Sequence, residues 1–210
     1  MRKIGILGGT FNPIHNGHLA IGKAALRRLK LDEVLFMPAC IPPHKQNVPM
    51  TAGDLRAEMV EAAIADEPSF SCSRLELEKE GVSYTADTLR ILTKEYGRGV
   101  RLYLLVGSDS LCYMEHWYEP EVIFSLAHIG VYYRTVNDYT FVRDHAAMLR
   151  ARFNAKITIF RKDDTVDISS TELREALTDP NSKKALEYLP GPVLNIIREK
   201  GLYKSAVAQD

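Results

Sequence analysis

The stretch GGTFNPIHNGHL (residues 8–19) follows directly on the short apolar run IGIL (residues 4–7). Such an apolar run is typical of a buried strand, and the apolar spacing after Asn16 is typical of a helix with Asn16 as its N-cap. The stretch therefore predicts a strand, a glycine-rich loop and a helix in direct succession. Two histidines in it, His15 and His18, raise the question of what they bind.

Length, composition and charge describe a chain that can build its own core. Its 210 residues are 46% hydrophobic, which favours a globular protein with a single domain over residues 1–210. Lysine and arginine together number 27, as do aspartate and glutamate, so the formal net charge is +0. A neutral chain is poorly suited to nucleic-acid backbones or anionic membranes, but it is compatible with a local basic pocket. We therefore expect a small phosphorylated partner, and neither nucleic acid nor membrane.

The three cysteines, Cys40, Cys72 and Cys112, are widely spaced and form no CxxC pair. This pattern argues against a disulfide framework or a structural zinc site, and it favours free thiols in a reducing compartment. The chain begins with charged Arg2 and Lys3 and then only four apolar residues, which does not resemble a signal peptide. No apolar run approaches the ~18 residues that span a bilayer, so a cytoplasmic protein is expected.

Strand-like and helix-like segments alternate along the rest of the chain. Strands are expected at residues 3–7, 34–37, 70–77, 101–106, 128–133 and 157–160. Helices are expected after Asn16, after a cap at Thr51, over residues 85–96 and between Pro192 and Gly201. Such alternation is typical of a Rossmann-like, doubly wound α/β fold, in which helices cover both faces of a mostly parallel sheet and ligands bind beyond the carboxyl ends of the strands. Residues 165–210 are expected to form a C-terminal helical portion of the same domain.

The glycine-rich loop has the features of an anion site. Gly8 and Gly9 leave room for close backbone approach, and a helix beginning near Gly17 directs its positive end and its N–H groups to the same place. His15 and His18 would then flank a bound phosphate. A loop or helix-cap role is the alternative for such a histidine pair, and zinc is disfavoured because an HxxH pair lacks a third ligand of matching character.

A second candidate anion site lies in ISSTELR at residues 168–174. Ser169 followed by Glu172 three residues later is a capping box, which predicts a helix start. A capping box is often purely structural. Here the stacked hydroxyls of Ser169, Ser170 and Thr171 and the fork of Arg174 favour a phosphate-binding helix start.

Together these two motifs carry a family resemblance. GGTFNPxHxGH combined with ISSTxxR resembles the nucleotidyltransferase superfamily of the HxGH type, and within it the bacterial nicotinate mononucleotide adenylyltransferases. Further segments follow the order of that family, over a span from Lys3 to about Tyr203: Pro42-Pro43-His44-Lys45, Ser83-Tyr84-Thr85-Ala86-Asp87-Thr88-Leu89, Gly107-Ser108-Asp109, His116-Trp117 and Gly201-Leu202-Tyr203.

The resemblance implies an enzyme of NAD biosynthesis. It would join the AMP moiety of ATP to nicotinate mononucleotide, giving nicotinate adenine dinucleotide (deamido-NAD) and pyrophosphate. The implied partners are these two small molecules, with Mg²⁺ held by the triphosphate rather than by a protein metal site. The sequence leaves the oligomeric state open, a homo-oligomer included.

The resemblance also assigns residues to three groups. Catalysis falls to His15, His18 and Arg174. Contacts with ATP and its phosphates fall to Gly8, Gly9, Thr10, Phe11, Lys45, Ile168, Ser169, Ser170 and Thr171. Contacts with the mononucleotide fall to Tyr84, Thr85, Gly107, Asp109, Trp117 and Arg134.

The chemistry of the implied reaction is compatible with these residues. A 5′-phosphate that attacks the α-phosphorus of ATP needs no protein nucleophile, but two polyanions must be aligned and the developing charge compensated. We expect His18 to contact the α-phosphate in the transition state, His15 the triphosphate beside it, and Lys45 a phosphate from its proline-rich loop. On the mononucleotide, the resemblance implies that Trp117 stacks on the pyridine ring while the helix start at Thr85 offers N–H groups to the ring carboxylate.

Two departures from the family pattern stand out, and alternatives remain. Asn12 stands where the family usually has aspartate, and Arg134-Thr135-Val136 stands where it usually has Arg-Pro-Gly. Pantetheine-phosphate adenylyltransferase shares both phosphate motifs, but it is typically shorter and lacks the Tyr-Thr and His-Trp segments. A regulatory module that binds ATP without turnover is a second alternative. A nucleic-acid-binding protein is disfavoured by the neutral charge.

Overall fold

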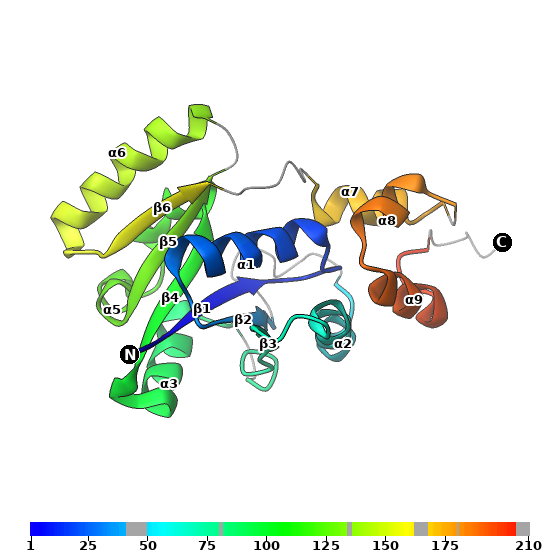
Figure 1. Cartoon of the computed structure of the whole chain (residues 1–210), viewed down its shortest axis with the longest axis horizontal. Coiled ribbons are helices and arrows are strands. Elements are labelled where there is room, and N and C mark those ends of the chain that lie inside the picture. Colours follow the sequence, from blue (N-terminus) through cyan, green and yellow to red (C-terminus); the bar gives the residue numbers. More distant parts are fainter. Residues whose placement is uncertain (41–49, 80–81, 134–135, 162–167, 180, 205–210) are drawn as a thin grey trace.

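A computed structural model describes residues 1–40, 50–79, 82–133, 136–161, 168–179 and 181–204. Its centre is a six-stranded sheet in the order β3-β2-β1-β4-β5-β6, and every neighbouring pair is parallel (Figure 1). The strands are β1 (Arg2–Gly9), β2 (Glu33–Pro38), β3 (Phe70–Cys72), β4 (Val100–Gly107), β5 (Ala127–Tyr133) and β6 (Ile157–Arg161). The predicted Rossmann-like, doubly wound α/β fold is confirmed.

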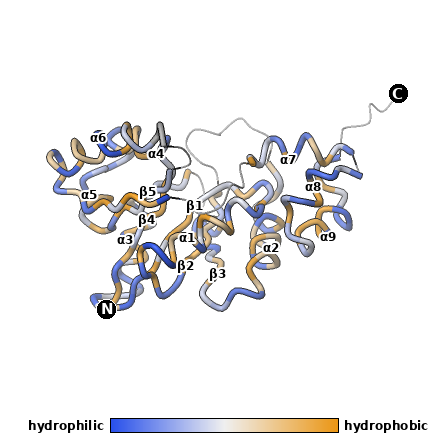
Figure 2. Tube along the Cα trace, turned by 45° about the horizontal axis from the view of Figure 1, so that its top comes forward, coloured by the Kyte–Doolittle hydropathy of each residue, from blue (hydrophilic) through white to orange (hydrophobic). Residues whose placement is uncertain are grey.

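The two faces of the sheet bury separate clusters, because successive side chains of a strand point to opposite faces. In β1, Ile4 and Ile6 belong to one cluster and Leu7 to the other. Helices α1 (Asn16–Leu29) and α2 (Gly53–Ile64) cover the face of Leu7. Helices α3 (Thr85–Tyr96), α5 (Pro120–Leu126) and α6 (Val136–Phe153) cover the face of Ile4. Figure 2 shows hydrophobic colour along β4 and β5 in the middle of the sheet, as expected for strands buried on both faces.

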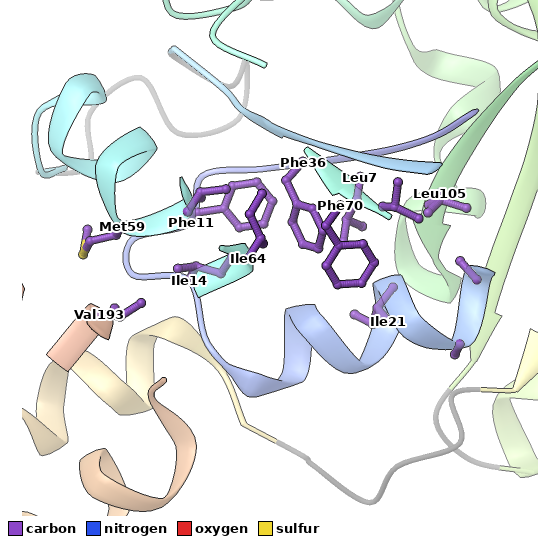
Figure 3. Close-up of a cluster of buried hydrophobic side chains, with 14 of the residues drawn as sticks. Leu7, Phe11, Ile14, Ile21, Phe36, Met59, Ile64, Phe70, Leu105 and Val193 are labelled. Carbon is purple, nitrogen blue, oxygen red and sulfur yellow. The ribbon is translucent and has the colours of Figure 1, made fainter. Parts of the chain in front are cut away.

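Three C-terminal helices pack at the end of the molecule where α1 begins (Figure 1). They are α7 (Ser170–Ala176), α8 (Lys183–Tyr188) and α9 (Gly191–Lys200). Their buried residues, among them Leu173, Ala185 and Val193, belong to the same cluster as those of α1 and α2. Figure 3 shows this shared cluster, with Phe11 and Ile14 of the loop between the sheet, α2 and Val193.

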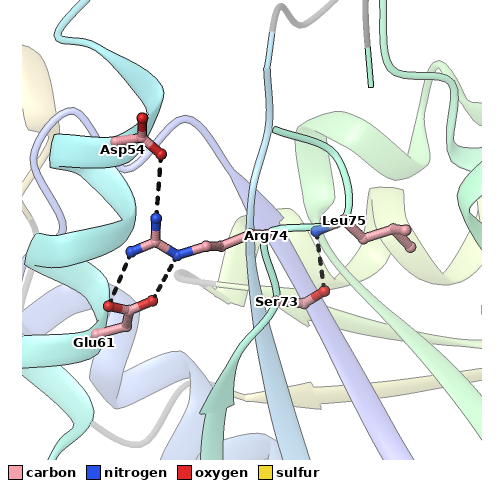
Figure 4. Close-up of polar contacts among 5 residues, drawn as sticks. All are labelled: Asp54, Glu61, Ser73, Arg74 and Leu75. Carbon is pink, nitrogen blue, oxygen red and sulfur yellow. Dashed lines mark hydrogen bonds and ion pairs between the residues drawn. The ribbon is translucent and has the colours of Figure 1, made fainter. Parts of the chain in front are cut away.

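Several predicted elements are confirmed with small shifts at their ends, and one strand is much shorter than predicted. The strand predicted over residues 70–77 ends at Cys72. Beyond it the chain turns, with the Leu77 N–H donating to the Arg74 carbonyl at 2.8 Å. The Arg74 side chain bonds to Asp54 and Glu61 of α2, as Figure 4 shows, so this part of the chain pairs with a helix and not with a strand.

Two predicted helix caps are wrong by one residue. His15, and not Asn16, is the N-cap of α1. Ala52, and not Thr51, is the N-cap of α2, because the Ala52 carbonyl accepts from the Arg56 N–H at 3.1 Å. Thr51 precedes the cap, and its backbone N–H and carbonyl contact Asn12 and Arg56. The prediction did not include α5, α6, α8, α4 (Ser108–Leu111) or the 3₁₀ turns η1 (Gly97–Gly99) and η2 (Met114–His116). Within the described ranges, no helix is both long and apolar enough to span a membrane.

Candidate active site

The glycine-rich loop lies at the carboxyl edge of the sheet, between the end of β1 at Gly9 and the start of α1 at Asn16. The neighbours of β1 are β2 on one side and β4 on the other, so the strand order reverses here. Ligands of doubly wound folds bind at this reversal point. Gly8 is exposed there, and an added Cβ would meet no described atom within 4 Å.

The two histidines lie against each other at the start of α1. His15 is 4% exposed and His18 is half-buried, and their ring centroids are 3.8 Å apart. The backbone N–H of His15 donates to Nδ1 of His18 at 3.3 Å. An accepting Nδ1 places the proton of a neutral His18 ring on Nε2, which makes Nε2 the donor of that ring. The rings thus lie where the N–H groups of the first turn of α1 also converge.

Small and aromatic neighbours hold the histidine pair in place. An added Cβ at Gly17 would lie 2.9 Å from Nδ1 of His15 and 3.5 Å from Cγ2 of Ile168, so glycine is required for this packing. Phe11 meets the His18 ring edge-on, with centroids 5.0 Å apart. Gly9 leaves room for the Phe11 ring, whose Cζ would lie 3.1 Å from an added Cβ. Phe11 is 1% exposed and supports His18 from within the core.

The second predicted motif joins the first through α7. Arg174 donates to the Asn12 carbonyl at 2.8 Å, and the Ser170 hydroxyl donates to the Pro13 carbonyl at 3.0 Å. Arg174 also donates to Oγ1 of Thr171 at 3.0 Å. The structure therefore brings ISSTxxR onto the glycine-rich loop across more than 150 residues of sequence.

The predicted capping box of α7 is confirmed. Oγ of Ser169 accepts from the Glu172 N–H at 3.2 Å, and the Ser169 N–H donates to the Glu172 carboxylate at 2.9 Å. Hydrogen bonds from Lys184 and from Ser169 lower the pKa of Glu172 to about 2. The hydroxyls of Ser169 and Ser170 are thus bonded to the Glu172 carboxylate and the Pro13 carbonyl.

Beneath the loop lies a buried polar network that the sequence did not reveal. Asn12 is 4% exposed, and its Oδ1 accepts from the Tyr203 hydroxyl at 2.7 Å and from the Thr51 N–H at 3.4 Å. Burial raises the pKa of Tyr203, which keeps its hydroxyl a donor. An uncharged amide suits these neutral donors, since a buried carboxylate would need a charged partner. Asparagine in place of the usual aspartate is therefore compatible with the loop geometry.

Arg56 of α2 is the charged member of this network. It is 2% exposed, and its guanidinium donates to the carbonyls of Thr10 at 2.7 Å, Thr51 at 2.9 Å and Cys40 at 3.5 Å. Burial lowers the pKa of the Arg56 guanidinium, but its three contacts are to neutral acceptors and an arginine keeps its charge in proteins. Arg56 is thus a fixed positive charge directly below the loop. Its signal in the sequence was an arginine inside a predicted core-facing helix.

The residues expected to contact the mononucleotide reach the same edge from the other face of the sheet. Gly107 ends β4 and is the N-cap of α4, and Asp109 is exposed in the first turn of that helix. Tyr84 is the N-cap of α3 and Thr85 its first residue. Trp117 is half-buried after η2 and packs against the core on the α3 side. Tyr84, Thr85, Gly107 and Asp109 thus lie at the starts of α3 and α4, and their contact with a mononucleotide stays a prediction.

Two predicted site residues and the expected metal ion remain to be considered. Lys45 and Arg134 lie outside the described residues. No group of three or more His, Cys, Asp and Glu side chains in the described part of the chain could hold a metal ion. Mg²⁺ in nucleotide-dependent enzymes commonly binds through substrate phosphates and water.

The chain is similar to known proteins in sequence and in fold. A family model described as Cytidylyltransferase-like matches residues 6–176. The nicotinate-nucleotide adenylyltransferase of Bacillus subtilis (strain 168) is 38% identical in an alignment of 210 positions that covers 98% of this chain and 100% of that protein. A probable nicotinate-nucleotide adenylyltransferase of Lachnoclostridium phytofermentans is 37% identical over 97% of this chain and 100% of the relative. The solved Plasmodium falciparum nicotinic acid mononucleotide adenylyltransferase complexed with NaAD has the same fold, with a TM-score of 0.75 at 20% identity over 97% of this chain and 98% of that one.

Proposed function

The chain belongs to the cytidylyltransferase-like family and, within it, to the nicotinate-nucleotide adenylyltransferases, and from this membership we propose the reaction that it performs. It transfers the AMP moiety of ATP to nicotinate mononucleotide, forming nicotinate adenine dinucleotide and pyrophosphate. The observation that supports this function most directly lies at the reversal point of the sheet. There Arg174 donates to the Asn12 carbonyl of the loop that carries the stacked histidine pair. Two small-molecule substrates suffice as partners.

The reaction requires positioning rather than a protein nucleophile. A phosphate oxygen of the mononucleotide forms a bond to the α-phosphorus of ATP, and the bond to the β-phosphate oxygen breaks with its electron pair leaving on pyrophosphate. The attacking phosphate is already anionic near neutral pH, so no side chain has to remove a proton. The protein has to align two mutually repelling anions and compensate the charge that develops.

The glycine-rich loop supplies that compensation. Nε2 of His18, at the start of α1, donates to the α-phosphate as its charge rises, and His15 lies against it beside the β- and γ-phosphates. The N–H groups of the first turn of α1 and the fixed charge of Arg56 add positive potential at the same place. Arg174 and the hydroxyls of α7, which lie against the same loop as the histidines, add further donors for the triphosphate. Mg²⁺ entering with ATP would neutralise part of the triphosphate charge.

The acceptor lies around the start of α3. Backbone N–H groups at Thr85 bind the ring carboxylate of nicotinate, and Trp117 stacks on the pyridine ring. Gly107 and Asp109 bind the ribose hydroxyls at the end of β4. A carboxylate at a helix start is favoured by hydrogen bonds and by the helix dipole, whereas a carboxamide gains little from the dipole.

The test is pyrophosphate release from ATP with defined acceptors. Nicotinate mononucleotide should give turnover with formation of nicotinate adenine dinucleotide, identified by mass spectrometry. Phosphopantetheine in its place, or no acceptor, should give none. Turnover with phosphopantetheine would instead indicate the related pantetheine-phosphate chemistry, and ATP binding without turnover would indicate a regulatory module.

A further inference from the structure

The turn that carries Trp117 is fastened to the rest of the molecule from two sides. It runs from η2 (Met114–His116) through Trp117 to Glu119, whose φ of 49° lies in the left-handed region before α5 begins at Pro120. Trp117 is the only tryptophan of the chain. An acidic residue lies two positions before it and another two positions after it, Glu115 and Glu119.

Each of these carboxylates is paired with a base from a different helix. Nε2 of His145 in α6 lies 2.8 Å from Oε2 of Glu115, and these side chains are only 18% and 14% exposed. NH1 of Arg90 in α3 donates to Oε2 of Glu119 at 2.7 Å. Hydrogen bonding to Arg90 is the main cause that lowers the pKa of Glu119. The turn is therefore held between α3 and α6.

Arg90 has a second contact that bears on the acceptor. The same NH1 donates to Oδ1 of Asp87 at 3.0 Å. Asp87 lies in the first turn of α3, where an unpaired aspartate can fold back onto the N–H groups of the helix start. Those are the N–H groups that the proposed function assigns to the ring carboxylate. Arg90 thus draws Asp87 away from them and offsets its negative charge.

The aromatic contact at this place agrees with a positioning role. The Tyr118 ring, between Trp117 and Glu119, packs on the Tyr84 ring at the start of α3, with centroids 4.6 Å apart. The contact between Arg90 and Glu119 closes the same gap between the turn and α3. Exposed ion pairs contribute little to overall stability, so the main consequence of this network lies in the position of the turn.

We propose that Arg90 and His145 are positioning residues for the acceptor: both hold the Trp117 turn, and Arg90 alone also keeps Asp87 from competing with the nicotinate carboxylate. This inference rests on the proposed function. The two residues are expected to differ in their effect on the choice between nicotinate and nicotinamide mononucleotide. Loss of His145 displaces Trp117 and weakens both mononucleotides alike. Loss of Arg90 displaces Trp117 and in addition releases a negative charge at the carboxylate site.

The test uses the full-length enzyme with Arg90→Ala, His145→Ala and the control Arg74→Ala. Arg74 is a matched control because its side chain is 38% exposed, against 43% for Arg90, and it bridges Asp54 and Glu61 in the same manner away from the turn (Figure 4). Arg90→Ala should raise the KM for nicotinate mononucleotide by about 3- to 10-fold, with kcat and the KM for ATP within about twofold of wild type. Arg74→Ala should leave all three values unchanged. An equal rise in the KM for nicotinate mononucleotide and the KM for ATP in Arg90→Ala would overturn the assignment.

The ratio of catalytic efficiencies with nicotinate and nicotinamide mononucleotide separates positioning from a merely structural effect. Arg90→Ala should lower this ratio by about 3-fold or more, because the released carboxylate of Asp87 repels the acid and not the amide. Asp87→Asn in the Arg90→Ala background should restore the ratio. His145→Ala should leave the ratio unchanged while raising the KM for each of the two mononucleotides. An unchanged ratio in Arg90→Ala would overturn the role assigned to Asp87.

Trp117 supplies a readout that does not depend on turnover. Its fluorescence emission should shift in Arg90→Ala and in His145→Ala and remain as in wild type in Arg74→Ala. Glu115→Gln tests the same contact if His145→Ala folds poorly. It keeps the shape of the Glu115 side chain but removes its charge, and it should also shift the emission. Unchanged emission in all variants would overturn the inference. Absence of activity with nicotinate mononucleotide in wild type would overturn the proposed function instead.

Discussion

The two regions that we propose to bind the triphosphate and the acceptor are held together by different means. Around the glycine-rich loop, Asn12, Arg56 and Tyr203 form buried hydrogen bonds that join the loop, α2 and the C-terminal segment. Around the Trp117 turn, an exposed ion pair joins Arg90 to Glu119, and a largely buried contact joins His145 to Glu115. Buried hydrogen bonds are costly to break, whereas exposed ion pairs are weak and screened by salt. We therefore expect the proposed triphosphate site to be held more firmly than the proposed acceptor site.

The largest expected effect lies in the proposed triphosphate site. His18→Ala should lower kcat by roughly 100-fold or more, because a donor aimed at developing charge is worth a few kcal/mol in the transition state. The loss should be the same with nicotinate and nicotinamide mononucleotide, since the proposed partner of His18 is the α-phosphate and not the acceptor ring. Steady-state kinetics with both acceptors check this. Wild-type kcat in a folded variant, shown by circular dichroism, would remove His18 from the reaction.

Tyr203→Phe should have a smaller effect that tests the burial of the network. It removes the donor to Asn12 and should reduce the free energy of unfolding by about 1 kcal/mol. The KM for ATP should rise because the loop carrying His15 and His18 loses a support, while the KM for nicotinate mononucleotide stays near that of wild type. Urea unfolding and kinetics measure the two quantities. A rise in the acceptor KM alone would contradict the division of the site into two halves.

The smallest effect concerns Glu172 and appears only in acid. Its pKa is lowered from the ordinary 4.5 to about 2 by Lys184 and Ser169, so its charge stabilises the folded state fully above about pH 4.5 and this contribution disappears as the pH falls toward 2. Glu172→Gln should therefore be less stable than wild type at neutral pH, and the difference should shrink between pH 4.5 and 2. Urea unfolding over this range measures it. A stability difference that stays constant with pH would contradict the pairing.

Much of the fold follows from local patterns, because buried parallel strands are apolar runs and each ends near a turn residue. The strand predicted at residues 101–106 is found as Val100–Gly107, and the helix predicted at residues 85–96 is found as Thr85–Tyr96. The strand predicted at residues 70–77 ends at Cys72 because the chain turns at Arg74, whose side-chain partners in α2 are distant in sequence. In α6, Val142, Ala146 and Leu149 have helical spacing that could have been recognised.

The site was predictable where it depends on spacing and not where it depends on contacts across the chain. The capping box at Ser169 is a local pattern and was found in full. Tyr203 lies 191 residues from Asn12, and nothing in the sequence around either residue indicates their hydrogen bond. The same holds for Arg90 and Glu119, which only the packing of α3 beside the Trp117 turn brings together.

The most direct test compares nicotinate and nicotinamide mononucleotide as acceptors for the wild-type enzyme, with kcat/KM measured by pyrophosphate release at saturating ATP. Charge-assisted hydrogen bonds to the ring carboxylate at the start of α3 predict a preference for nicotinate of at least about 10-fold. A Trp117→Ala variant should lose efficiency with both acceptors while its affinity for ATP is retained. Comparable kcat/KM for the two mononucleotides would contradict a carboxylate site at Thr85, and an unchanged acceptor KM in Trp117→Ala would contradict the stacking of the ring.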